Sequence, residues 1–109
     1  MASDQRADQR ADQVAAGRAK VLPDGAAPYR SLGPFGPADL PTGLLRTHRL
    51  AEGVWGLLRL QAGRAVFVWE DGSGEREELA APAELVVPPQ VPHHLEVEGD
   101  FRIALTFHR

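Results

Sequence analysis

No cysteine occurs among the 109 residues of the chain. Disulfide bonds and thiolate metal sites are therefore excluded, and a metal ion could be held only by histidine, carboxylate or water. The absence of cysteine also agrees with a reducing compartment, so a cytoplasmic location is the expectation.

Long apolar runs and an excess of basic charge are absent too. No stretch approaches the roughly 20 apolar residues of a membrane span, and the first residues, which include Asp4 and Asp8, hold no apolar run of signal-peptide length. Lysine and arginine number 12 against 15 aspartate and glutamate residues, which gives a net charge of −3. We therefore expect neither a membrane nor a nucleic acid as a partner.

The chain also lacks the patterns of nucleophilic and phosphoryl-transfer enzymes. Its three serines, Ser3, Ser31 and Ser73, lie outside any Gly-x-Ser-x-Gly pattern. The glycines beside Ser73 are not followed by the lysine of a phosphate-binding loop. Hydrolase and kinase functions are not indicated.

The composition divides the chain into a tail and one domain. Residues 1–22 carry a tandem Ala-Asp-Gln-Arg repeat, and a helix of that period would bury no apolar face, so we expect a disordered or frayed-helix tail. Residues 23–109 are the expected domain. Its first part, up to Pro41, is rich in Gly and Pro, which predicts an irregular wrap with a short extended piece over 29–32.

After residue 43 the pattern becomes that of β-strands. Short apolar runs alternate with polar residues between turn residues, and no amphipathic helix separates them. This predicts an all-β fold, an antiparallel sandwich or barrel. The expected strands are 44–50, 54–62, 64–70, 75–79, 84–87, 94–97 and 101–107, with turns at 61–64 and 98–100 among those between them.

The histidines are the residues that could carry chemistry. Successive side chains of a strand point to opposite faces, so His93 and His94 cannot both face inward without a bulge. We take His93 as inward and His94 as a residue of the rim. With His48 and Glu96 placed at the same mouth, His93 would complete a shell for a divalent metal such as zinc, iron or manganese. The alternative is that His48 hydrogen-bonds to backbone and that the other two are surface residues.

Other residues could line a ligand pocket beside this shell. Trp55 would supply a flat apolar wall near His48, and Arg46 is one of several arginines that could clamp an anion. The competing interpretation makes Trp55 a core aromatic and the arginines solvated strand residues.

The order of these segments resembles the small cupin-like domain of the TehB/YeaR-like family, which occurs alone or fused before a tellurite-resistance methyltransferase. The resemblance implies a small cupin-like, jelly-roll-type antiparallel β-barrel with an irregular N-terminal wrap, and a role in a stress response to tellurite or nitrogen oxides. The residues that carry it are Tyr29-Arg30-Ser31, Phe35, His48, Gly53-Val54-Trp55-Gly56, Leu60-Gln61-Ala62-Gly63-Arg64, Pro88-Pro89-Gln90-Val91-Pro92-His93, Glu96 and the closing 101–109.

Cupins in general hold a divalent metal with three histidines and a glutamate, and the resemblance carries this role to His48, His93 and Glu96. Two positions depart from the wider pattern. Gln90 stands where the second cupin motif usually has glycine, and Thr106 stands where related domains often place a carboxylate, which makes it a pocket residue.

Three functions stay open at this point. The first is a module that binds an unidentified small molecule or a metal. The second is a metal-dependent enzyme of the dioxygenase or isomerase type, with open metal positions for substrate. The third is a structural barrel that forms a homodimer through an exposed edge strand.

Overall fold

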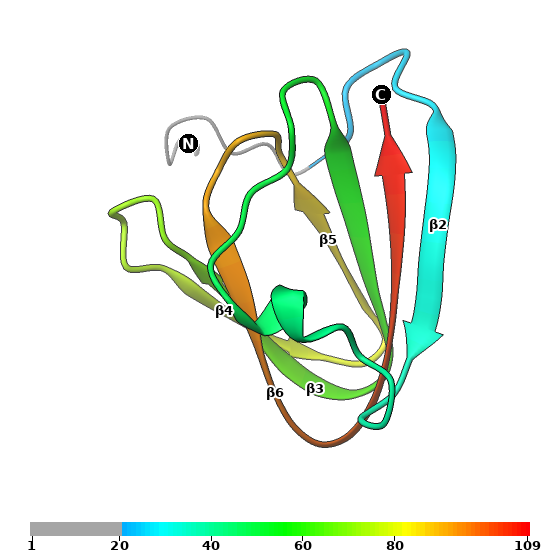
Figure 1. Ribbon diagram of the computed structural model, residues 1–109, viewed down its shortest axis with the longest axis vertical. Coiled ribbons are helices and arrows are strands. Elements are labelled where there is room, and N and C mark those ends of the chain that lie inside the picture. Colours follow the sequence, from blue (N-terminus) through cyan, green and yellow to red (C-terminus); the bar gives the residue numbers. More distant parts are fainter. Residues whose placement is uncertain (1–20) are drawn as a thin grey trace, which may run out of the picture.

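The computed structural model describes residues 21–109, so nearly all of the expected tail, residues 1–22, lies outside the described residues (Figure 1). The described part is one antiparallel sheet with the strand order β2-β6-β3-β4, in which β5 also pairs with β3. The all-β prediction is confirmed. The elements are β2 (Pro28–Phe35), the short 3₁₀ helix η1 (Thr42–Leu45), β3 (Trp55–Trp69), β4 (Arg76–Ala80), β5 (Ala83–Val87) and β6 (His93–His108).

Two long strands, β3 and β6, form the centre of the sheet and pair with each other along most of their length. The predicted hairpin turn at 61–64 and the predicted turn at 98–100 are therefore wrong, because both lie inside continuous strands. Between the pairs Gly63–Phe101 and Ala65–Val97, β6 advances by more residues than β3. Both turn signals mark one shared bend, where the sheet changes direction.

Gly63 shows why this bend needs glycine. Its φ is +80°, a conformation that costs little only for glycine. A Cβ atom at this position would also overlap the carbonyl oxygen of Asp100 on β6. The glycine that the sequence offers for a hairpin instead lets two strands cross closely at the corner of the sheet.

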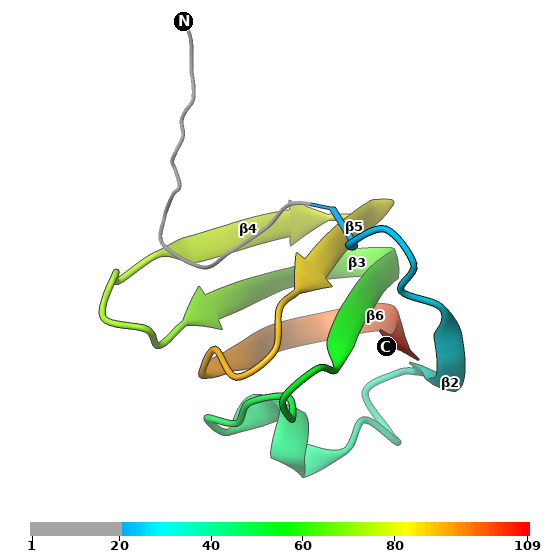
Figure 2. The ribbon, with the colours of Figure 1, turned by 90° about the horizontal axis from the view of Figure 1, so that it is seen from above.

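The bend curls the sheet because β4 and β5 use different stretches of the same strand edge. β4 pairs with Arg64–Val68 of β3, and β5 pairs with Gly56–Leu60 on the other side of the bend. Seen from above, β3 and β6 lie between β4 and the η1 segment (Figure 2). The curled sheet thus has a concave inner face that η1 borders.

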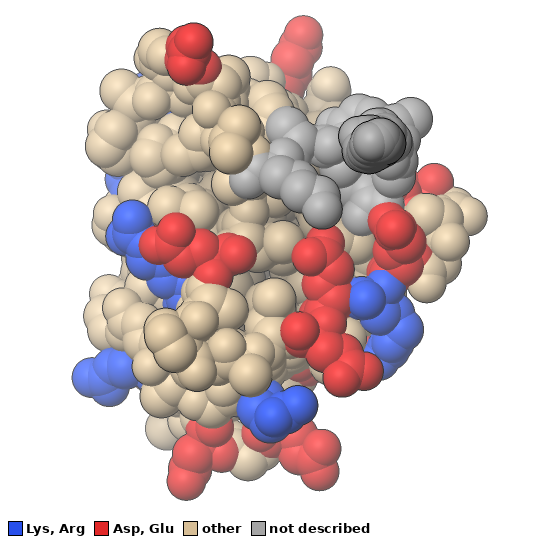
Figure 3. Space-filling view, turned by 180° about the vertical axis from the view of Figure 1, so that it is seen from behind, with Lys and Arg blue, Asp and Glu red and all other residues tan. Residues whose placement is uncertain are grey.

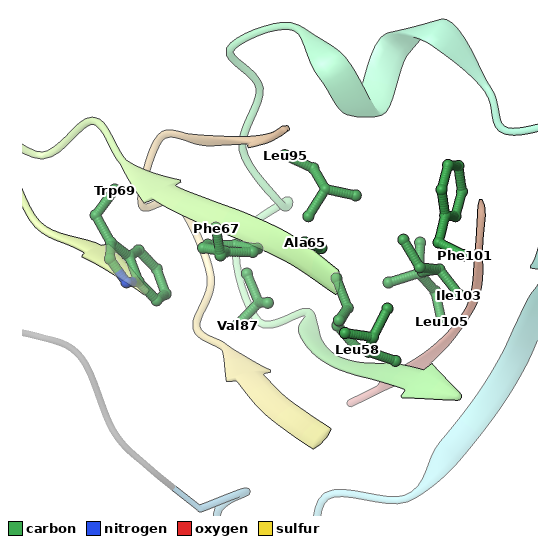
Figure 4. Packing of buried hydrophobic residues seen from close by; sticks show 10 residues of the cluster. Leu58, Ala65, Phe67, Trp69, Val87, Leu95, Phe101, Ile103 and Leu105 are labelled. Carbon is green, nitrogen blue, oxygen red and sulfur yellow. The ribbon is translucent and has the colours of Figure 1, made fainter. Parts of the chain in front are cut away.

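The hydrophobic core fills that inner face (Figure 4). Trp69 lies at one end of the cluster and Phe101 at the other, and Ile103 is fully buried. Most of its members alternate along β3 and β6 with residues that are half-buried or exposed, as expected for a sheet whose inner face is the more deeply buried one. The buried cluster consists of Leu58, Leu60, Ala65, Phe67, Trp69, Val87, Leu95, Phe101, Ile103 and Leu105.

The strand expected over 44–50 does not form. Pro41 precedes a 3₁₀ turn over Thr42–Leu45, and the following segment makes a single isolated bridge, between His48 and His93. Burial nevertheless varies along this segment in the way that suggested a strand. Leu44, His48 and Leu50 are half-buried on the side facing the core, whereas the residues between them are exposed.

Candidate functional site

The backbone brings His48 and His93 together directly. The N–H of each residue donates to the carbonyl oxygen of the other, both at 2.9 Å. In such an antiparallel pair the two side chains lie on the same face. The N–H of Gln90 donates to the carbonyl of Leu50 at 2.9 Å and holds the same two segments together further along. Residues 45 positions apart therefore present their rings to one space.

The rings then meet through their Nε2 atoms, which lie 3.1 Å apart. The Nδ1 atom of His48 lies 2.8 Å from the carbonyl oxygen of Arg46, and Nδ1 of His93 lies 2.8 Å from that of Val91. Each histidine thus hydrogen-bonds through Nδ1 to the carbonyl oxygen of the residue two positions before it. A carbonyl oxygen only accepts hydrogen bonds, so both Nδ1 atoms carry the proton and both Nε2 atoms keep a lone pair.

The contacts of the two rings require one more hydrogen or cation than two neutral imidazoles provide. Three contacts need a hydrogen or a cation between their atoms, namely the two Nδ1–carbonyl contacts and the Nε2–Nε2 contact. Two neutral imidazoles carry only two ring hydrogens. The third contact is favourable only if an additional proton or a metal ion lies between the Nε2 atoms of His48 and His93.

The surroundings of His93 disfavour the proton. Its side chain is only 3% exposed, and its ring packs 4.8 Å from the ring of Phe67. Burial lowers the pKa of His93 to about 4, despite the Val91 carbonyl, which favours the protonated form. At neutral pH His93 is therefore a neutral imidazole with a free Nε2 lone pair, the form that binds metal ions.

The pair borders an apolar cavity of about 110 Å³. Among residues 21–109, the two histidines are the only polar side chains in its wall. Leu44 and Leu50 belong to the segment around His48, and the rest of the wall comes from the sheet. The lining residues are Leu44, His48, Leu50, Gly56, Leu58, Phe67, Val87, His93, Leu95, Leu105 and Phe107.

Glu96 does not join His48 and His93. Register is continuous from His93 to Glu96 against β3, so no bulge intervenes and strand alternation places Glu96 on the outer face with His94. Its carboxylate accepts from Arg76 Nη2 at 2.7 Å and from His94 Nε2 at 3.0 Å. This placement corrects the expectation that Glu96 lies at the same mouth as the histidine pair.

His94 is the centre of a charged cluster on the outer face. Its Nδ1 donates to Glu70 Oε2 at 2.6 Å and its Nε2 donates to Glu96. Hydrogen bonds to Glu96 and Glu70 raise the pKa of His94, because both carboxylates stabilise the imidazolium. Acidic and basic side chains lie side by side on the back of the molecule, on the side of β4 (Figure 3).

Glu70 connects the outer cluster to both histidine segments. Its Oε2 accepts from the hydroxyl of Thr47, the neighbour of His48, and from the ring of His94, the neighbour of His93. Its backbone N–H also donates to the carbonyl of Pro92 at 2.8 Å. Neither Glu70 nor Thr47 was expected from the sequence, and only their positions next to a strand end and a histidine hint at this role.

The residues expected to line the ligand pocket lie elsewhere. Arg46 has an exposed side chain and contributes its carbonyl oxygen instead. Trp55 and Thr106 stand on the outer face of β3 and β6, because their neighbours Gly56 and Phe107 line the cavity. The Thr106 hydroxyl lies 3.3 Å from that of Ser31 on β2. None of these three, nor His94, lines the cavity.

Within residues 21–109, no group of three or more His, Asp or Glu side chains is arranged to hold a metal ion. The fourth histidine, His108, pairs across the sheet with Trp55, away from the other three. It is buried, and in the described part of the chain neither of its ring nitrogens has a hydrogen-bond partner. The described residues also include no helix long and apolar enough to cross a membrane.

Comparison with known proteins places this geometry in context. The sequence model of a family described as the TehB-like domain matches residues 30–105. No curated protein matches the sequence.

Two solved structures, with TM-scores well above 0.5, show the same fold. TehB from Haemophilus influenzae matches with a TM-score of 0.68 and 22% identity, over 76% of this chain but only 31% of TehB. A protein from E. coli strain K12 matches with a TM-score of 0.73 and 19% identity, over 82% of this chain and 95% of the other. A cupin-2 domain containing protein from Shewanella frigidimarina matches with a TM-score of 0.49 and 18% identity, over 56% of each chain.

Proposed function

The chain belongs to the TehB-like domain family, and we propose that it is a binding module that holds one divalent transition metal ion between His48 and His93. The observation that supports this proposal is the convergence of two Nε2 lone pairs at 3.1 Å. With both Nδ1 atoms committed to carbonyl oxygens, a cation between the rings turns a repulsive contact into an attractive one.

The donor set fits a metal ion. Two imidazole nitrogens on a tetrahedral zinc ion, each about 2.1 Å from the metal, lie about 3.4 Å apart, close to the separation of the two Nε2 atoms. Histidine ligands of metals also typically donate their other ring N–H to a backbone carbonyl or a carboxylate, which fixes the tautomer. Both His48 and His93 do so with their own chain.

Two protein ligands leave positions for water or for a small molecule. Glu96 is engaged by Arg76 and His94, so it is not part of the proposed shell. The metal would supply Lewis acidity beside the apolar cavity, while the chain's own residues orient the rings and keep bulk water out. An enzyme of the small cupin type remains the second candidate, because the open positions adjoin a cavity large enough for a substrate.

The biological setting follows from the family resemblance. A role in a stress response to tellurite or nitrogen oxides and a cytoplasmic location are both part of this proposal. The chain spans only 31% of the length of TehB. Within this proposal the domain acts as a sensor or accessory part of that response.

Metal analysis of purified, untagged protein tests the proposal. After incubation with zinc, manganese or ferrous iron and removal of free metal, wild type should retain about one ion per chain, and His48→Ala should retain none. The matched control is Arg49→Ala, next to His48 but exposed, which should bind as wild type does. Equal retention by wild type and His48→Ala, or no retention by wild type, contradicts the proposal.

A further inference from the structure

We propose that the cavity selects a ligand with one metal-binding donor atom and a small, uncharged, apolar remainder. The inference rests on the proposed function, since the donor atom would bind the ion held by His48 and His93. It adds the polarity and the size of the rest of the ligand. The wall of the cavity, rather than the histidines, supports this step.

The wall offers nothing to a charged or strongly polar group. Apart from the two histidines, every lining residue in the described part of the chain is glycine or apolar, and none is lysine, arginine, serine or threonine. A polar group moved from water into such surroundings without a hydrogen bond loses roughly 2–7 kcal/mol. An ion loses more. Only the end of the ligand that faces His48 and His93 can therefore be polar.

The volume limits the size of the remainder. The cavity measures about 110 Å³, whereas an apolar cavity of about 150 Å³ in another protein is known to bind benzene. A remainder of up to about five non-hydrogen atoms is the corresponding estimate. Leu44, His48, Leu50 and Phe107 are the half-buried members of the wall, so a ligand of this size would enter past them.

This selectivity argues against free oxyanions as direct ligands. Tellurite and nitrate each carry three oxygen atoms around a small centre, and at most one face of such an ion can point at the metal. The remaining oxygens would lie against leucine and phenylalanine side chains such as Leu58 and Phe67. If the domain takes part in an oxyanion response, the inference is that it recognises a less polar molecule.

Cobalt-loaded protein provides the test, because ligand binding changes the visible absorption of bound cobalt. At pH 8 we would titrate pyridine, which has one nitrogen donor and five carbon atoms, against nicotinate, which adds a carboxylate to the same ring, and against selenite. Pyridine should half-saturate at a concentration at least tenfold lower than either anion. Equal or tighter binding of nicotinate or selenite would overturn the inference.

Two neighbouring leucines supply matched variants. Leu44 lines the cavity, whereas Leu45 is 41% exposed. Leu44→Trp should weaken pyridine binding at least tenfold while cobalt is retained, and Leu45→Trp should change it less than twofold. Unchanged pyridine binding in a Leu44→Trp protein that still holds cobalt would contradict a ligand in this cavity.

Failure of the proposed function is distinguishable from failure of this inference. If wild type holds no cobalt, the metal proposal fails and the same ligands are titrated into metal-free protein, with the methyl resonances of Leu58 and Leu95 as the readout. The cavity wall is unchanged there, so pyridine should still shift these resonances and the anions should not. If pyridine causes no shift, the cavity inference fails as well.

Discussion

His93 and His94 are adjacent in the chain yet sit in opposite environments. His93 faces the core, where burial lowers its pKa to about 4 and leaves a neutral ring whose Nε2 faces His48. His94 faces outward, where hydrogen bonds to Glu96 and Glu70 raise its pKa. Strand alternation alone produces this contrast. The inner histidine is suited to bind a cation, and the outer one is itself the cation of a closed charged cluster.

The two regions also differ in whether the ring nitrogens of their histidines have hydrogen-bond partners of opposite character. In the outer cluster both ring nitrogens of His94 have carboxylate partners, so the cluster needs no ligand. In the inner pair the Nε2 atoms of His48 and His93 face each other, and both keep a lone pair. Function is therefore expected at the inner pair, with the outer cluster as its support.

Replacement of each histidine in turn tests this contrast most strongly. We expect His93→Ala to weaken zinc affinity at least about a hundredfold, because one of two protein ligands is lost and a lone imidazole binds zinc poorly. His94→Ala should weaken it less than tenfold, since His94 only supports the segment. Competition with a chromogenic chelator measures both values. A larger loss for His94→Ala than for His93→Ala would reverse the assignment of inner and outer faces.

The pH dependence of stability in metal-free protein gives the next largest effect. His93 has a folded-state pKa of about 4, below its unfolded value of about 6.5. Between these values the unfolded chain binds the additional proton, so stability falls as the pH falls. From pH 6.5 to pH 5 the free energy of unfolding should decrease by roughly 2 kcal/mol from this group.

Urea unfolding in the presence of a chelator measures this slope. His93→Gln removes the titrating group and should flatten the dependence over that range. His94→Gln should leave the slope over that range nearly unchanged, because a histidine with a raised pKa contributes stability that is fully present below its unfolded value of about 6.5 and is lost only as the pH rises through its higher folded-state value. Identical slopes in His93→Gln and wild type would show that His93 titrates normally.

Glu70 and Glu96 offer a finer comparison, because both accept from His94 but only Glu70 also accepts from Thr47. Glu70→Ala should lower zinc affinity about tenfold, since loss of residues that support metal ligands typically costs 10- to 100-fold. Glu96→Ala should lower it no more than about threefold. Calorimetric titration with zinc measures both, and equal losses would mean that the contact with Thr47 does not position His48.

Strand alternation correctly predicts which face of the sheet a side chain occupies. The prediction for Glu96 was wrong because it did not follow this rule. The sequence placed His93 and His94 on opposite faces, as the structure does. The same rule puts Glu96 with His94, although Glu96 was expected at the mouth with His48 and His93. The apolar runs located most strands, while Gly63 signalled a turn that is in fact a bend, because local conformation does not reveal which distant segment packs against it.

The sequence did not show which distant segments lie side by side in the folded chain. Nothing near His48 specifies that its backbone pairs with His93, since an isolated bridge has no periodic signal. Glu70 and Thr47 were missed for the same reason, because their roles depend on where three separate segments meet. The cavity wall likewise combines residues from η1, the following loop and three strands, so its apolar character appears only in the folded chain.

The smallest expected effect concerns Gln90, which links the two histidine segments through its bond to Leu50. Its φ is +65°, in the left-handed region where a side chain costs roughly 1 kcal/mol relative to glycine. Glycine stands here in the wider cupin pattern, and its greater freedom in the unfolded state offsets part of that gain. Gln90→Gly should therefore raise the free energy of unfolding by about 0.5 kcal/mol without changing zinc affinity. A clear destabilisation in urea would mean that the Gln90 side chain itself holds the loop, and a loss of zinc affinity would mean that a rigid residue 90 is needed to keep His93 opposite His48.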